Sequence, residues 1–145
     1  MEAANTDEPV LRILHFNDVY DIQPNDKNGD YGAYYFKAHL DQHRNDRTIT
    51  LFSGDAFSPS ILSTLFDGWQ MVHCLNEFHI DAACYGNHEF DYDISHTEEL
   101  AMKCNFPWLL GNLIDKRTED PLGAAKDEVI LEKNGLRIGL FAVAE

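Results

Sequence analysis

The chain has 145 residues, of which 44% are hydrophobic and 12% aromatic, so it is long enough and apolar enough to fold around one core, and disorder of the chain as a whole is excluded. Its 11 Lys and Arg residues against 25 Asp and Glu residues give a formal net charge of -14. This charge repels a nucleic-acid duplex or an anionic membrane surface, which excludes both as general partners. An anionic substrate therefore needs local help, such as bound cations.

The cysteines and the N-terminal residues indicate a reducing compartment. Cys74, Cys84 and Cys104 are odd in number and form no CxxC pair, which favours reduced thiols. Residues 1–9 lack the basic and apolar parts of a secretion signal, and we expect a disordered lead there. No segment has the roughly 18 consecutive apolar residues of a membrane span. We predict a cytoplasmic location, unless a leader has been removed.

Four segments have the β-branched and aromatic content of strands, and each ends on polar residues. They cover residues 10–18, 48–55, 80–87 and 106–112. Apolar residues recur at helical spacing between them, over residues 34–43, 58–67, 69–78 and 95–103. The pair Ser58 and Pro59 suits an N-cap and a first turn, and Ser95 to Glu98 is a capping-box pattern.

This order, β-α-β-α-β-α-β, predicts an α/β fold with a mostly parallel sheet layered with helices. Asn134 and Gly135 are a strong hairpin signal, which adds a C-terminal β-hairpin over residues 128–143. Ligands of such sheets gather at the carboxyl ends of the strands. The polar strand ends are therefore expected at one edge of the sheet.

Three of these strand ends carry oxygen ligands: Asp18, Asp55 and Asn87. A single Asp after a strand is usually an N-cap or an Asx-turn residue, but three at one edge, next to the imidazole of His88, favour a metal site. Oxygen and imidazole donors suit Mn, Zn, Fe, Co or Mg. A pair of such ions would also balance the charge of a phosphate.

Three motifs in this order resemble those of a known family. "ILHFNDVYD" (residues 13–21), "LFSGDAFSPS" (51–60) and "YGNHEFD" (85–91) are similar to the first three motifs of the calcineurin-like metallophosphoesterases, in their 5'-nucleotidase branch. The resemblance implies the first half of a metallophosphoesterase α/β sandwich. It also implies a hydrolase of phosphoesters, acting in nucleotide catabolism on a small phosphorylated substrate such as a nucleotide.

Carried over by position, the resemblance implies two metal ions, divalent or of mixed valence, and a metal-bound hydroxide that attacks phosphorus. Asp18 would bind the first metal, Asp55 would bridge both, and Asn87 would bind the second. His88 would face the phosphate, with Asp91 orienting its ring. The alternative for His88 is a loop histidine bonded to Asp91 without a catalytic task. Glu89, between them, is interpreted as a solvent-facing or helix-capping residue rather than a ligand.

The sequence departs from the family pattern in two places. The first motif usually reads Asp-x-His, and Tyr20 stands at the histidine position. Tyr20 could bind a ferric ion as a phenolate, or could pack beside the first metal as a neutral phenol. The downstream histidine motifs of the family are absent, because His96 is the last histidine in the chain. We therefore expect residues 10–145 to be an incomplete, N-terminal portion of the domain.

Two other interpretations remain open. The chain could be a non-catalytic scaffold or ligand-binding module, with Tyr20 as the mark of a decayed metal site. It could also be complete and assemble its site with another subunit. The motifs leave the oligomeric state, the metals and the substrate undetermined.

Overall fold

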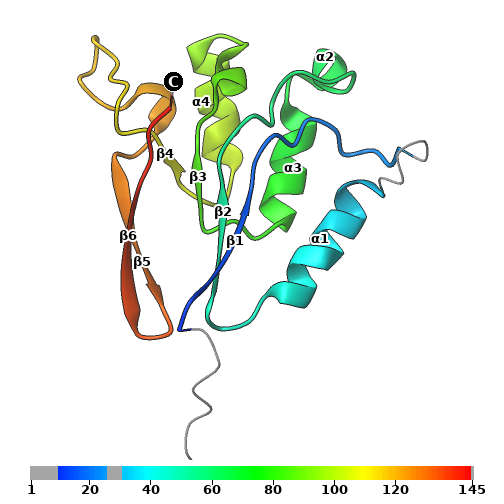
Figure 1. Cartoon of the computed structure of the whole chain (residues 1–145). Coiled ribbons are helices and arrows are strands. Elements are labelled where there is room, and N and C mark those ends of the chain that lie inside the picture. The colour runs from blue at the N-terminus through cyan, green and yellow to red at the C-terminus, as the bar shows by residue number, and fades with distance from the viewer. Residues whose placement is uncertain (1–9, 26–30, 145) are drawn as a thin grey trace, which may run out of the picture.

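The computed structural model describes residues 10–25 and 31–144, and these form a parallel sheet with helices on one side and a hairpin beside it (Figure 1). The expected disordered lead, residues 1–9, lies outside the described residues. Four parallel strands lie in chain order across the sheet: β1 (Arg12–Phe16), β2 (Thr48–Phe52), β3 (Ala82–Cys84) and β4 (Trp108–Leu109). The predicted α/β class and parallel pairing are confirmed.

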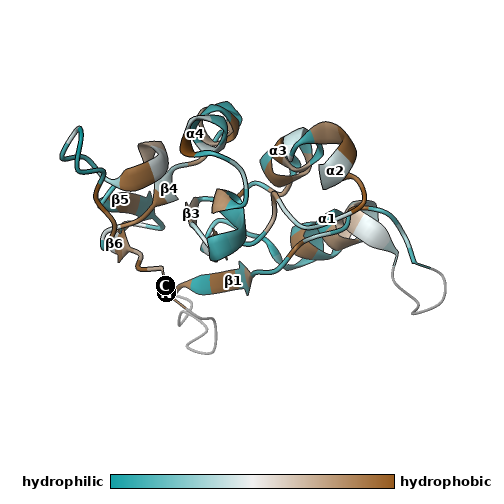
Figure 2. Cartoon of the chain, turned by 90° about the horizontal axis from the view of Figure 1, so that it is seen from above, coloured by the Kyte–Doolittle hydropathy of each residue, from teal (hydrophilic) through white to brown (hydrophobic). Residues whose placement is uncertain are grey.

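Within the described residues, four α-helices and two short 3-10 helices connect the strands. They are α1 (Gly32–His43), α2 (Ser63–Phe66), α3 (Trp69–Glu77), η1 (Asn87–Phe90), α4 (Ile94–Lys103) and η2 (Leu122–Ala124). Figures 1 and 2 show α1, α3 and α4 on the same side of the sheet. Phe52 of β2, Leu75 of α3 and Leu100 of α4 are at most 1% exposed, so the core lies between the sheet and these helices. This packing holds the carboxyl ends of the strands at one edge.

Helix α1 begins at Gly32, two residues before the predicted start, and the starts of α2 and α4 differ from the prediction in the side chains that cap them. Helix α2 begins at Ser63, because the Ser60 hydroxyl accepts the Ser63 N–H at 2.9 Å and the Ser63 hydroxyl accepts the Ser60 N–H at 2.7 Å. Helix α4 begins before Ser95, because the Asp93 carboxylate caps it by accepting the His96 N–H at 3.0 Å. In α2 and α4, a side chain other than the predicted cap accepts a free N–H group of the first turn.

Strand β4 is only two residues long, shorter than the predicted segment 106–112. The backbone beyond it pairs with later parts of the chain: the Leu110 N–H donates to the Lys126 carbonyl at 3.0 Å, and the Gly111 N–H donates to the Ala142 carbonyl at 2.8 Å. The segment that leads into the hairpin and the segment that leaves it therefore both pair with the backbone after β4, at this end of the sheet.

The C-terminal hairpin is confirmed, with β5 (Glu128–Lys133) antiparallel to β6 (Leu136–Phe141). Asn134 and Gly135 join them with φ angles of 50° and 75°, the left-handed geometry of a tight hairpin turn. The end of β6 lies beside β2 and β3, since Phe141 and Leu51 line the same small cavity. No helix in the described part of the chain is long and apolar enough to cross a membrane.

Candidate metal centre

The predicted ligands lie together at the carboxyl edge of the sheet, on the turns that follow β1, β2 and β3. The Asp18 N–H donates to the Gly54 carbonyl at 3.0 Å, which joins the first turn to the second. The His88 N–H donates to Asp55 Oδ1 at 3.0 Å, which joins the second turn to the third. The prediction that these strand ends meet at one edge is therefore confirmed, while their roles as ligands stay a prediction.

Both candidate aspartates have left-handed backbone conformations. The φ angle is 56° at Asp18 and 65° at Asp55. A residue with a side chain adopts this region at a cost of about 1 kcal/mol, and such conformations cluster at functional sites. The Asp55 carboxylate is half-buried and the Asp18 carboxylate is exposed, so the turns present both side chains at the open edge.

Two glycines allow the second and third turns to touch. A Cβ atom added to Gly86 would overlap the Asp55 carboxylate, with Asp55 Cγ at 2.7 Å and Asp55 N at 2.8 Å. A Cβ atom added to Gly54, which has a φ of 80°, would overlap the backbone of Gly86. Only glycine leaves room for this approach, and it places Asp55 directly against the backbone that carries Asn87.

Glu89 holds these two turns together, and its role was only half predicted. Its side chain is 0% exposed, so the solvent-facing interpretation was wrong and the helix-capping one was right. Its Oε1 accepts the N–H groups of Ala56 at 2.6 Å and Phe57 at 3.3 Å, and its Oε2 accepts those of Asp55 at 2.7 Å and Gly86 at 2.8 Å. Burial raises the pKa of Glu89, and these backbone hydrogen bonds oppose the rise.

His88 and Asp91 form the predicted pair. His88 Nδ1 lies 2.8 Å from Asp91 Oδ2, and both side chains are about one-third exposed to solvent, at 33% and 39%. The hydrogen bond to Asp91 raises the pKa of His88, and the charges of Asp91 and Asp55 add to the rise against a smaller effect of burial. Burial acts to raise the pKa of Asp91, but hydrogen bonds from His88 and Ser58 lower it overall. The pair therefore favours a protonated, positively charged imidazole.

Tyr20 contacts both halves of the site. Its hydroxyl donates to Asp18 Oδ1 at 2.8 Å, and its ring meets the His88 ring edge-on with centroids 5.7 Å apart. Burial and the hydrogen bond to Asp18 raise the pKa of the phenol, so Tyr20 is neutral here. In this geometry Tyr20 positions Asp18, and its direct binding of a metal as a phenolate stays a prediction.

The residues present fit a metal only in part. The described residues contain no group of three or more His, Cys, Asp or Glu side chains placed to hold an ion. Asp18 and Asp55 supply carboxylate oxygens and Asn87 supplies an exposed amide, which are donors suited to Mg and Mn but too few for a full shell. His96 does not complete it, because its Nε2 bonds to the Asp67 carbonyl at 2.7 Å.

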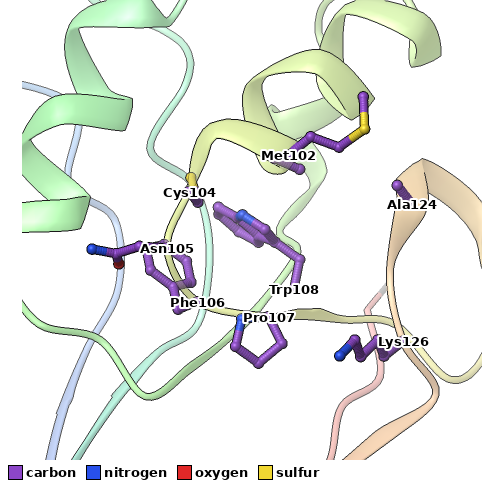
Figure 3. A pocket seen from close by; sticks show the side chains of 9 residues that line it. Met102, Cys104, Asn105, Phe106, Pro107, Trp108, Ala124 and Lys126 are labelled. Carbon is purple, nitrogen blue, oxygen red and sulfur yellow. The ribbon is translucent and has the colours of Figure 1, made fainter.

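A cavity that is separate from the candidate centre lies away from this edge. It has a volume of about 400 Å³ and is lined by the end of α4, the start of β4 and Lys126. Figure 3 shows the side chains of Cys104, Trp108 and Lys126 that line it. No predicted ligand or catalytic residue takes part, so this cavity does not belong to the candidate centre.

Comparisons with known proteins agree with the motifs. No model of a protein family matches the chain. It is 31% identical over 137 residues to the uncharacterised metallophosphoesterase YunD of Bacillus subtilis, covering 92% of this chain and 29% of that protein. It is 30% identical over 139 residues to a 5'-nucleotidase of Vibrio cholerae, covering 92% of this chain and 25% of that protein.

Solved structures of nucleotidases also match this chain. The fold matches the NAD nucleotidase of Haemophilus influenzae with a TM-score of 0.80 and 26% identity, covering 92% of this chain and 26% of that one. The fold also matches a 5'-nucleotidase precursor of Thermus thermophilus with a TM-score of 0.77, covering 92% of this chain and 28% of that one. The chain spans about a quarter of the length of these relatives. In sequence and fold the chain is therefore similar to part of the 5'-nucleotidases and metallophosphoesterases.

Proposed function

We propose that the chain carries part of the active site of a metal-dependent phosphoester hydrolase that acts on a small phosphorylated substrate such as a nucleotide. The observation that carries this proposal is the meeting of Asp18, Asp55 and the His88–Asp91 pair at one sheet edge. The names of the relatives, 5'-nucleotidase and metallophosphoesterase, support it. Residues 10–145 would then be the first part of a catalytic domain.

Two divalent ions are proposed for this edge. Asp18 would hold the first, Asp55 would lie between both, and Asn87 would hold the second; other ligands would come from outside the described residues. When bound, such ions polarise a phosphoryl group and activate water for in-line attack. The charge of the chain supports this, because Asp18 and Asp55 would repel a phosphate unless cations lay between them.

His88 is proposed to act on the leaving oxygen. Because Asp91 accepts the proton on Nδ1, Nε2 is the nitrogen left to donate to the substrate. In the hydrolysis, the bond between phosphorus and the ester oxygen breaks. Water supplies a hydroxyl group to phosphorus and a proton to the released alcohol. Tyr20, edge-on to His88, would keep the imidazole from turning away.

A second candidate function is a non-catalytic scaffold. Tyr20 favours it, because this residue replaces the usual histidine of the first motif and its hydroxyl donates a hydrogen bond to one carboxylate oxygen of Asp18.

The proposed compartment is reducing, such as the cytoplasm, because Cys74, Cys84 and Cys104 are all free thiols.

Metal binding by matched variants tests the proposal. The intact protein is stripped with a chelator and titrated with Mn²⁺, beside Asp55→Asn and the control Asp46→Asn. Both variants remove one carboxylate charge. Asp46 is a suitable control because it lies exposed in the turn before β2, at the opposite edge of the sheet from the candidate centre. We expect Asp55→Asn alone to lose Mn²⁺. Equal binding by wild type and both variants would overturn the proposal, and Asp55-dependent binding without phosphate release would favour the scaffold.

A further inference from the structure

Helix α1 carries a pair of histidines that the candidate centre does not use. His39 and His43 are four residues apart, and side chains at this spacing are neighbours on one face of a helix. Their imidazole rings meet edge-on, with centroids 4.7 Å apart and an angle of 74° between the ring planes. Both side chains are exposed, so the two rings share one patch of the solvent-facing surface.

The nitrogens of both rings are available to a ligand. Within the described residues, neither imidazole takes part in a hydrogen bond or an ion pair. His39 also lines a hollow of about 480 Å³, together with Tyr35 and Gln42. A metal ion at the pair would therefore displace no protein partner, and the hollow leaves room for the water molecules that complete its coordination shell.

The carboxylate of α1 lies away from the pair. Asp41 is two residues from each histidine, and two residues turn a helix by about 200°, so its side chain projects from the opposite side. Its charge is already balanced, because its oxygens lie 2.7 Å from Lys37 Nζ and 2.5 Å from an Arg44 guanidinium nitrogen. Arg12 does approach the pair, since its guanidinium donates to the His43 carbonyl at 2.8 Å. The imidazoles alone must therefore hold the ion, against the positive charge of Arg12.

An imidazole pair without a carboxylate selects among metals. Imidazole suits Ni, Cu and Zn, whereas Mg and Mn prefer oxygen ligands, and the affinity of nitrogen sites rises from Mn²⁺ to Cu²⁺. The candidate metal centre has the reverse character, since Asp18, Asp55 and Asn87 offer oxygen donors. The two places also lie at opposite edges of the sheet: α1 ends at His43, shortly before β2 begins, whereas the centre lies where the strands end (Figure 1).

We propose that His39 and His43 form a second metal site, which takes a divalent transition cation such as Ni²⁺, Cu²⁺ or Zn²⁺ and is separate from the candidate metal centre. Each ring would give one nitrogen to the ion, and water would fill the other positions. Because one helix holds both ligands, the second imidazole binds at a high effective concentration, and the bound ion clamps the last turn of α1. This inference goes beyond the proposed hydrolase function and does not depend on it.

Titration of the intact, chelator-stripped protein with Ni²⁺ tests this site, with His39→Ala, His43→Ala and their double variant beside the control His73→Ala. All three histidines are exposed on helices, so each substitution removes one imidazole and leaves the core intact. We expect each single variant at position 39 or 43 to weaken Ni²⁺ binding at least about tenfold, nearly as much as the double variant, because one ring alone is a poor ligand. His73→Ala should bind like wild type.

Thermal unfolding gives a second measurement. Saturating Ni²⁺ should raise the unfolding midpoint by more in wild type and His73→Ala than in His39→Ala, because the ion then binds the folded chain more tightly. The proposal is overturned if wild type shows no saturable Ni²⁺ binding, if His39→Ala binds as tightly as wild type, or if the losses of the two single variants simply add.

Asp55→Asn separates this site from the candidate centre. This variant should keep the Ni²⁺ site on α1, since it leaves both imidazoles in place. Ni²⁺ binding that requires Asp55 but not His39 would assign the ion to the candidate centre and would overturn the second site. If the histidine-dependent Ni²⁺ site is found while Mn²⁺ binding does not depend on Asp55, the second site stands and the proposed hydrolase function fails.

Discussion

Replacing Glu89 by Gln should destabilise the chain by about 3 kcal/mol. The amide can keep one oxygen for Ala56 and Phe57, but its NH₂ group then faces the N–H groups of Asp55 and Gly86. Two buried donors lose their acceptor, at about 1–3 kcal/mol each, and relief of the buried charge offsets part of that loss.

Urea denaturation followed by circular dichroism measures this change. With a typical slope of about 1.5 kcal/mol/M, the midpoint should fall by about 2 M, or the variant should be unfolded without urea. Glu99→Gln is the matched control, because Glu99 lies exposed on α4. The reasoning is refuted if Glu89→Gln and Glu99→Gln unfold at the same urea concentration as wild type.

Three further predictions concern single side chains. Asp18→Gly should leave the free energy of unfolding unchanged or raise it by up to about 1 kcal/mol, since glycine favours a φ of 56°, while isothermal titration shows weaker Mn²⁺ binding; a large loss of stability would contradict this. Tyr20→Phe should weaken Mn²⁺ binding only about tenfold, as for a residue that positions a ligand, and complete loss would indicate direct ligation. Burial raises the pKa of the Cys104 thiol to about 11, so at pH 8 a thiol reagent should modify it about a hundredfold more slowly in the folded than in the urea-unfolded chain, and equal rates would refute this.

The order of the strands and the position of the polar strand ends were predictable from the sequence. Each strand segment is apolar first and polar last, and parallel pairing brings such ends to one edge. Asp18, Asp55 and Asn87 follow β1, β2 and β3 as expected. The hairpin was equally clear, because Asn134 and Gly135 suit the positive φ angles of the turn.

The burial of Glu89 was not predictable in the same way. The sequence shows only its capping position, three residues after Gly86. Its other hydrogen bonds reach the turn at Asp55, Ala56 and Phe57, more than thirty residues away in the chain, and depend on how closely the two turns pack. A short-range pattern contains no information about such a contact.

The histidine pair on α1 also depends on tertiary packing. Helix spacing places His39 and His43 on one face of α1. Only the docking of α1, in which Phe36 packs against Phe16 and Phe78, decides that both imidazoles stay exposed. The spacing predicts that the two rings are neighbours, but it does not predict that this part of the helix stays uncovered.

Phosphate release from AMP by the intact protein tests the central proposal most directly. The protein is measured after treatment with a chelator and again after addition of Mn²⁺, beside His88→Ala and the control His73→Ala, whose side chain is exposed on α3. Release should require Mn²⁺, fall at least about a hundredfold in His88→Ala, and persist in His73→Ala. No Mn²⁺-dependent release, or equal release by the two variants, would contradict a hydrolase that uses this centre.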